Sequence, residues 1–321
     1  MFLFSLVGLC VIVYYIIHFL VFYYLDSDLE LYLLSKLGKP IDTLRGKVVW
    51  ITGASSGIGR DLAIVLAKHG VRLCLSSRKQ SDLFKVKQEC VEASRGYLHA
   101  NDVLVLPMDM LEIDNHKKCF DKVIDYFKTL DILVNNAGRS QRAEWNTIQL
   151  KVDRELFELD VFAVVNLSRI ALNFFLKKNI QGHIAVTSSV TGLVGFPNSA
   201  TYTAAKHALH GYFETLRNEP FECNVTIFCP GPTATNFLQE CFTDTPGAKY
   251  NQSVQPEDKR MTSARCGYLY AVALANKTHL SWVGNFPINA ICYIGCYYPN
   301  VKKLALKIVG MRRLNQVRDS R

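Results

Sequence analysis

Tyr202 and Lys206 stand four residues apart, and Ser189 precedes the tyrosine by thirteen residues. On a helix, side chains four residues apart lie on one face, so the lysine ammonium would sit one turn from the phenol. A free tyrosine has a pKa near 10, which is too high for acid or base catalysis at neutral pH, and an adjacent cation lowers that pKa. These residue types suit the interconversion of a hydroxyl and a carbonyl group, in which Tyr202 gives or takes the proton, Lys206 tunes it and Ser189 holds the substrate oxygen.

Such chemistry also needs a hydride carrier, and a glycine-rich turn near the N-terminus predicts where that carrier binds. Residues 52–59 read Thr-Gly-Ala-Ser-Ser-Gly-Ile-Gly, and they join a predicted strand to a predicted helix. A pyrophosphate must closely approach the backbone N–H groups at a helix start, and a side chain at any of the three glycines would block that approach or the turn. The expected cofactor contacts are Thr52, Gly53, Ser55, Ser56, Gly57, Ile58 and Gly59.

The end of the second predicted strand bears on the choice between the two nicotinamide cofactors. An acidic residue about 20 positions past the glycines would hold the ribose 2′-hydroxyl of NAD, whereas an arginine there accommodates the 2′-phosphate of NADP. Ser77 stands where the acid would be, and Arg78 and Lys79 follow it. This pattern favours NADP(H); the alternative is a pair of solvated surface cations.

The elements that must position these residues alternate along the body of the chain. Strands are predicted at residues 47–52, 71–76, 103–106, 131–134, 183–187, 225–229 and 280–283. Helices are predicted at residues 58–69, 115–128, 153–177, 202–216 and 263–275. Apolar strands separated by helices are typical of a doubly wound α/β domain. We therefore predict a single Rossmann-fold domain over residues 44–285 with a seven-stranded parallel sheet.

The N-terminal segment differs in character from the body. Residues 2–25 contain no charged side chain, and a helix of that length exceeds the roughly 30 Å thickness of a bilayer's hydrocarbon core. A cleaved signal peptide, the alternative, would have a shorter apolar region, a positively charged front and small residues at its end. This segment ends instead in Val-Phe-Tyr-Tyr-Leu. We predict an uncleaved transmembrane anchor over residues 1–25.

The net charge of +9 is concentrated at the other end of the chain, which argues against nucleic acid as a partner. Residues 301–321 contain seven Lys or Arg residues, at positions 302, 303, 307, 312, 313, 318 and 321, and one acid, Asp319. An aromatic and apolar stretch, residues 282–298, precedes this run. An apolar patch beside a basic run is typical of a segment that lies on an anionic membrane surface, and we predict this for residues 286–321. A solvated basic tail behind a packed helix is the alternative.

The ten cysteines include no Cys-x-x-Cys pair. Cys74, Cys223 and Cys229 lie in apolar, strand-like runs, as expected of reduced and buried thiols. No metal site is expected.

Taken together, these motifs resemble those of the short-chain dehydrogenases/reductases, over residues 44–285. The matching elements, in order, are residues 52–59, Asp109 after the third strand, Asn135-Asn136-Ala137-Gly138, the set Ser189, Tyr202 and Lys206, and the Pro-Gly motif of residues 230–235. The resemblance implies that Asp109 contacts the adenine and that Lys206 also holds the nicotinamide ribose. It further implies cofactor contacts from Asn136, Ala137, Gly138, Tyr202, Pro230, Gly231, Thr233 and Thr235.

One residue departs from the family pattern. The family usually has an asparagine in the long helix before Ser189, where it helps hold a water that relays protons to the lysine, and this chain has Asp160 there. If only the backbone carbonyl holds the water, aspartate is tolerated. If the side chain matters, the relay is weakened, and a carboxylate near Lys206 would offset the effect of the lysine on Tyr202. We expect an active enzyme, with Asp160 among its catalytic residues.

Two functions follow from these observations. The first is a membrane-anchored, NADP(H)-dependent oxidoreductase of lipophilic steroid, retinoid or xenobiotic carbonyls; the resemblance to the family's membrane-anchored branch implies a single pass through the endoplasmic reticulum membrane. The second, which Asp160 alone favours, is a cofactor-binding protein of weak activity that acts as a membrane-tethered scaffold or sensor. The sequence leaves open the substrate, the reaction direction, the side of the membrane and the oligomeric state, a homodimer included.

Overall fold

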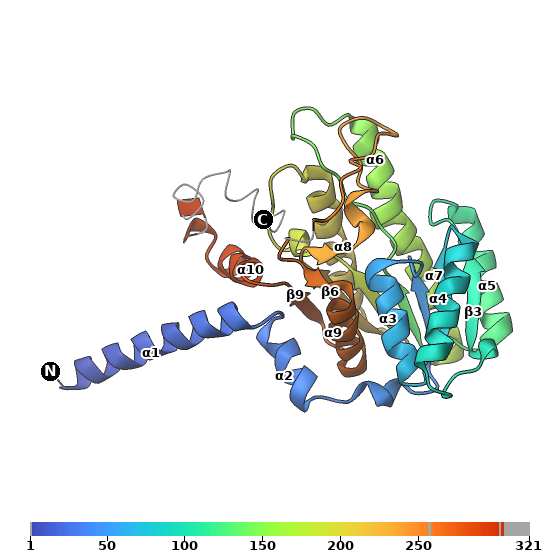
Figure 1. The fold of residues 1–321 in the computed structure, drawn as a ribbon, viewed down its shortest axis with the longest axis horizontal. Helices are drawn as coiled ribbons and strands as arrows, with labels where there is room; N and C mark the ends of the chain where they lie inside the picture. Colours follow the sequence, from blue (N-terminus) through green and yellow to red (C-terminus); the bar gives the residue numbers. More distant parts are fainter. Residues whose placement is uncertain (1, 256–257, 302, 305–321) are drawn as a thin grey trace.

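The computed structural model describes residues 2–255, 258–301, 303 and 304, and its core is one seven-stranded parallel sheet (Figure 1). The strands of this sheet are β1 (Val48–Thr52), β2 (Arg72–Ser77), β3 (Val103–Pro107), β4 (Ile132–Asn135), β5 (His183–Thr187), β6 (Asn224–Pro230) and β9 (Leu280–Val283). Their order is β3-β2-β1-β4-β5-β6-β9, and every neighbouring pair is parallel. The predicted doubly wound fold and its seven strands are confirmed.

Helices cover both faces of the sheet, as the apolar strands require. The helices are α1 (Phe2–Tyr24), α2 (Leu29–Leu37), α3 (Gly57–Lys68), α4 (Gln80–Ala93), α5 (His116–Phe127), α6 (Leu150–Phe157), α7 (Ala163–Lys178), α8 (Ala200–Asn218), α9 (Ser263–Asn276) and α10 (Ile288–Tyr297). The apolar sides of α3, α4 and α9 share one buried cluster, and those of α5, α7 and α8 share the other. Because both faces are buried, β1 and β4 have no exposed position.

The strand order reverses between β1 and β4, and this reversal positions the site. From β1 the chain first builds outward through β2 and β3, then returns to place β4, β5, β6 and β9 on the other side. In such sheets, ligands bind in the crevice outside the carboxyl ends of the strands at the reversal. The glycine turn follows β1, the Asn-Asn-Ala-Gly run overlaps the end of β4, and Ser189 follows β5.

The long helix predicted at residues 153–177 has an irregular centre. The structure has α6, then a π-helical turn over Glu158–Phe162, then α7. The amide of Ala163 donates to the carbonyl of Glu158, so one residue is added to this turn. π-Helical turns are rare and occur frequently at functional sites. Asp160 lies in this turn and its side chain is fully buried.

A second, two-stranded sheet was not predicted. It pairs β7 (Thr233–Ala234) with β8 (Met261–Thr262), which begin and end the excursion of chain between β6 and α9. The strands are too short for sequence periodicity to reveal them. Their pairing brings together the two ends of the loop over residues 235–260, which we call the substrate loop.

The N-terminal helix α1 projects away from the body of the molecule, and α2 and α10 lie near its base (Figure 1). At about 1.5 Å per residue, its 23 residues extend about 35 Å. Beyond it, Asp26 makes a two-bond ion pair with Arg265 of α9, and Leu31 of α2 is fully buried in the domain. The chain is thus fixed to the domain directly after α1.

Length and composition alone single out a different segment as able to cross a membrane. Among the residues that the structure describes, the helical stretch Leu150–Lys178 meets those criteria, but 56% of its apolar window is buried inside the domain. It is therefore a core helix of this fold. Within α1, the apolar stretch Ser5–Ile17 is shorter than those criteria require, and its large side chains are exposed.

The predicted membrane-associating segment, residues 286–321, is described in part. Its first section forms α10, on which Ile288 and Cys292 are buried against the domain; Tyr297 at the end of the helix and Tyr298 directly after it are exposed. The ring of Phe286 contacts that of Tyr23 at the end of α1. Most of the basic run at positions 302–321 lies outside the described residues.

Candidate active site

One cavity of about 1290 Å³ lies along the carboxyl ends of the strands. It is lined by all the predicted cofactor and catalytic residues except two, Gly59 and Asp160. The predicted residues that line it are Thr52, Gly53, Ser55, Ser56, Gly57, Ile58, Ser77, Arg78, Lys79, Asp109, Asn136, Ala137, Gly138, Ser189, Tyr202, Lys206, Pro230, Gly231, Thr233 and Thr235. The structure therefore brings segments from the ends of six strands, β1 to β6, into one site.

The glycine turn has the shape that a pyrophosphate needs. Gly53 and Gly57 have φ angles of +66° and +56°, which side chains disfavour, and a Cβ on Gly53 would lie 2.9 Å from the Cα of Ala137. Helix α3 begins at Gly57, and the side chain of Ser56 makes no capping hydrogen bond to its first turn. An anion at this helix start can accept hydrogen bonds from the backbone N–H groups of the first turn of α3. The turn therefore fits the pyrophosphate of a dinucleotide.

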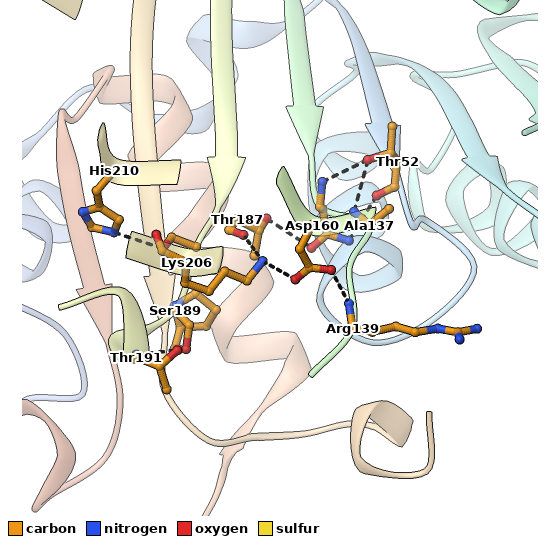
Figure 2. A network of polar contacts seen from close by, with 12 residues as sticks. Thr52, Ala137, Arg139, Asp160, Thr187, Ser189, Thr191, Lys206 and His210 are labelled. Carbon is orange, nitrogen blue, oxygen red and sulfur yellow. Dashed lines mark hydrogen bonds and ion pairs between the residues drawn. The ribbon is translucent and has the colours of Figure 1, made fainter. Parts of the chain in front are cut away.

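Gly59 and Thr52 hold the glycine turn against the end of β4. A Cβ on Gly59 would lie 2.5 Å from both the carbonyl oxygen of Gly53 and the side chain of Asn136, so no side chain fits there. Thr52 Oγ1 accepts hydrogen bonds from the amides of Asn136 and Ala137, at 3.0 and 3.1 Å (Figure 2). The Asn136 side chain donates to the carbonyls of Thr52 and Gly53. These hydrogen bonds connect the ends of β1 and β4 where both line the cavity.

The end of the cavity beside β2 and β3 suits the adenosine half of the cofactor. Arg78 and Lys79 follow directly after β2 and are exposed at the cavity's edge, where they could donate charge-assisted hydrogen bonds to a 2′-phosphate. Asp109 lies after β3, and its Oδ1 accepts a hydrogen bond from the amide of Leu111 at 3.0 Å. Ser77 stands at the position where an acidic residue would bind the ribose 2′-hydroxyl of NAD.

The three residues predicted to handle protons meet at the other end of the cavity. Ser189 follows β5 and begins a 3₁₀ turn over Val190–Gly192; its Oγ accepts from the Thr191 amide and donates to the Pro230 carbonyl. Tyr202 and Lys206 lie one turn apart on α8, with the ammonium nitrogen 5.4 Å from the centre of the phenol ring. All three side chains are buried to more than nine-tenths.

Asp160 contacts Lys206 of this catalytic set but does not line the cavity. Its Oδ2 lies 3.0 Å from the Nζ of Lys206, with both side chains almost wholly buried, and its Oδ1 accepts from the Arg139 amide at 2.8 Å (Figure 2). The same Nζ donates to the carbonyl of Thr187 at 3.1 Å. The Asp160 carboxylate thus lies directly beside Lys206, where it can offset the effect of the lysine on Tyr202.

The Asp160–Lys206 ion pair affects the pKa of Tyr202. Burial lowers the pKa of Lys206, but the charges of Asp160 and Tyr202 outweigh burial and hold that pKa above its ordinary value. Burial raises the pKa of Asp160, against the opposing effect of Lys206. Burial likewise raises the pKa of Tyr202; Lys206 lowers it and Asp160 raises it. The Asp160 carboxylate and the Lys206 ammonium therefore have opposite effects on the pKa of Tyr202.

Some contacts of this site were not predicted. Arg139, directly after the Asn-Asn-Ala-Gly run, supplies the amide that holds Asp160, and its position beside a motif would have been a signal. The backbone carbonyl of Thr187, which accepts from Lys206, carries no signal in the sequence. Residues of the substrate loop also line the cavity, among them Phe237, Leu238 and Phe242.

Comparisons with known proteins agree with this geometry. The family model for short chain dehydrogenase matches residues 47–246. The chain is 35% identical to human dehydrogenase/reductase SDR family member 7 over 322 residues, which covers 98% of this chain and 93% of that protein. The matched region thus includes the turn after β1 and all of the catalytic set.

Two solved structures share the fold. One is an alcohol dehydrogenase from the archaeon Thermococcus sibiricus complexed with 5-hydroxy-NADP, with a TM-score of 0.65 and 21% identity over 75% of this chain and 97% of that one. The other is a short chain dehydrogenase/reductase from Burkholderia phymatum in complex with NAD, with a TM-score of 0.67 and 23% identity over 81% of this chain and 96% of that one. On the family match and the near full-length similarity, the chain belongs to the short-chain dehydrogenase/reductase family of oxidoreductases.

Proposed function

We propose that the protein is a membrane-anchored, NADP(H)-dependent oxidoreductase that interconverts carbonyl and hydroxyl groups on lipophilic substrates. The observation that carries the proposal is the convergence of Ser189, Tyr202 and Lys206 on the cavity that also holds the glycine turn. Proton-handling groups and a dinucleotide site in one cavity match the two needs of the reaction, a proton and a hydride.

In this proposal the bound nicotinamide supplies or accepts the hydride, and the chain handles the proton. Ser189 orients the substrate oxygen by a hydrogen bond, and the Tyr202 hydroxyl gives its proton to that oxygen during reduction or takes it during oxidation. Because the pKa of Tyr202 is raised, the phenol is protonated at neutral pH, the form that reduction requires.

Activity of the purified, detergent-solubilised full-length chain tests the proposal. NADPH oxidation should be measured against a panel of steroid, retinoid and aromatic ketones, with NADPH binding followed separately by fluorescence. Turnover of at least one carbonyl class supports an enzyme. Tight NADPH binding without turnover of any carbonyl would favour the second function, a cofactor-binding scaffold or sensor. The buried Asp160–Lys206 pair is the observation on which that second function rests.

Arg78→Ala should weaken NADPH binding by about 1 to 3 kcal/mol, the scale of lost charge-assisted hydrogen bonds, because Arg78 is proposed to bind the 2′-phosphate. NADH lacks that phosphate, so its dissociation constant should stay nearly unchanged. Titration of both cofactors by protein fluorescence makes the measurement. Lys122→Ala removes one exposed cation from α5, away from the cavity, and serves as the matched control. Equal losses for both cofactors would exclude this role for Arg78.

We further propose that α1 anchors the protein in the endoplasmic reticulum membrane and that α10 lies against the membrane surface. The exposed apolar side chains of α1 and the exposed tyrosines that end α10 support this arrangement. Lipophilic substrates concentrate in bilayers, and Ile288 of α10 also lines the cavity, which gives such substrates a short path to the site. A homodimer remains a prediction.

Deletion of residues 1–24 should release most of the protein from membranes on alkaline carbonate extraction, whereas the intact chain should stay in the pellet. The cut spares Leu25, whose carbonyl accepts a hydrogen bond from Asn289, and Asp26, which pairs with Arg265. Full extraction of the intact chain would refute the anchor. Retention of the shortened chain would assign the binding to α10 and the residues after it.

A further inference from the structure

The loops that follow β4 and β7 are joined across one edge of the cavity. The amide of Phe242 donates to the carbonyl of Ser140, and the amide of Arg142 donates to the carbonyl of Phe242, both at 2.8 Å. These bonds form a short bridge between the segment after the Asn-Asn-Ala-Gly run and the substrate loop. Because β7 and β8 already hold the loop's two ends together, this bridge fixes its middle against the site.

An ion pair adds to this connection. Arg139 Nη2 lies 3.4 Å from Glu240 Oε2, and the guanidinium also packs over the ring of Phe242, 5.3 Å from its centre. While the Arg139 amide holds Asp160, the Arg139 side chain extends away from that carboxylate (Figure 2). The side chain is only 17% exposed, so its position is well constrained. Glu240 also pairs with Lys249, at 2.9 Å, within the same loop.

The charges around Glu240 keep it ionised. The hydrogen bond from Lys249 lowers the pKa of the Glu240 carboxyl, and the charges of Lys249, Arg139 and Arg78 lower it further, against a smaller opposing effect of burial. Arg78 is the residue proposed to bind the cofactor's 2′-phosphate. Glu240 and Arg78 line the same cavity. Of Lys249 and Arg139, the two residues that contact Glu240 directly, Arg139 is the one that connects the substrate loop to another segment.

We propose that the Arg139–Glu240 ion pair is a strap that closes across the bound nucleotide and limits the rate of its release. Both residues line the same cavity as Ser56 and Gly57 of the glycine turn, and this cavity has a volume of about 1290 Å³. A nucleotide on that turn thus has room beneath the closed loop. It leaves when the loop opens, and opening breaks the ion pair. The inference rests on the proposed function, since it requires a nucleotide in this cavity.

Release of NADPH from the full-length protein tests the strap. Protein bound to NADPH is mixed in a stopped-flow instrument with excess NADP⁺, and the decay of NADPH fluorescence gives the release rate. Glu240→Gln and Arg139→Gln should each raise that rate about fivefold, with little change in the association rate. The double variant should show about the same fivefold rise, because either single change already breaks the shared contact.

Two variants serve as controls. Lys249→Gln removes a charge beside Glu240 without breaking the connection to Arg139, and it should change release less than twofold. Asp121→Asn removes an exposed carboxylate that pairs with Lys117 on α5 and should change nothing. Release of NADH should rise by the same factor as release of NADPH, since the strap does not depend on the 2′-phosphate.

Other outcomes overturn the strap in distinguishable ways. Unchanged release in both single variants would show that the ion pair does not limit departure. Faster association and tighter binding in Glu240→Gln would show that the carboxylate competes with the cofactor for Arg139. Wild-type protein that binds neither NADPH nor NADH would instead contradict the proposed function itself.

Discussion

Tyr202→Phe should lower the turnover of carbonyl reduction by about 10²- to 10⁴-fold, the range for loss of a general acid. The substitution removes the hydroxyl proton and keeps the ring, which packs beside Phe237 in the cavity. NADPH binding should change by less than about 1 kcal/mol, the scale of one hydrogen bond. Steady-state turnover and an NADPH fluorescence titration on the same preparation separate the two effects.

Tyr212→Phe is the matched control for this variant. Tyr212 lies on the same helix, α8, but its side chain is exposed and does not line the cavity. It should retain wild-type turnover. If Tyr202→Phe keeps more than about a tenth of the wild-type rate while its control is normal, the proton comes from another group, and the proposed role of Tyr202 is wrong. A loss of NADPH binding in parallel with turnover would instead indicate damage to the site as a whole.

The sequence predicted those parts of the protein that depend on local patterns. The apolar run of β1, the glycines that follow it and the spacing of Tyr202 and Lys206 each lie within a few residues, where periodicity and steric rules apply. Assembly of these parts into one cavity then follows from the parallel sheet, since all the strands end at the same edge.

Contacts between distant segments could not be predicted in the same way. The family resemblance suggested a carboxylate near Lys206, but no sequence pattern identifies the π-helical turn in which Asp160 lies or the direct ion pair. The bridge between Ser140 and Phe242 joins two irregular loops about 100 positions apart. Helix α4 was missed because its exposed face carries many charged residues and only Leu83, Val86 and Cys90 are buried.

The Asp160–Lys206 pair has two effects that substitutions can separate, one on stability and one on the tyrosine. Replacing both members with apolar residues of similar size is often neutral for stability, whereas removing one member leaves a buried charge without its partner. Asp160→Ala should therefore lower the free energy of unfolding by about 3 to 5 kcal/mol. The double variant Asp160→Leu, Lys206→Met should recover most of that loss while remaining inactive. Thermal unfolding of the detergent-solubilised chain measures both, and an unchanged midpoint for Asp160→Ala would contradict the buried pair.

Asp160→Asn separates the electrostatic effect, because it keeps the size of the side chain and removes its charge. Lys206 still contacts the carbonyl of Thr187 and should stay protonated at neutral pH. With the opposing carboxylate gone, the pKa of Tyr202 should fall. Reduction needs the protonated phenol and oxidation needs the phenolate. The decline of reduction with rising pH should therefore begin at lower pH in the variant, and alcohol oxidation near neutral pH should rise.

The pH dependence of kcat/KM in both directions, for wild type and Asp160→Asn, makes this measurement. A shift of both profiles to lower pH would establish that the carboxylate raises the pKa of Tyr202 in the wild type and so keeps the phenol protonated to higher pH. A shift to higher pH would mean that Lys206 lost its proton with its partner, so that Asp160 supports the lysine more than it opposes it. Unchanged profiles, with rates within about tenfold of wild type or roughly 1.4 kcal/mol in barrier, would leave Asp160 a tolerated substitution for asparagine.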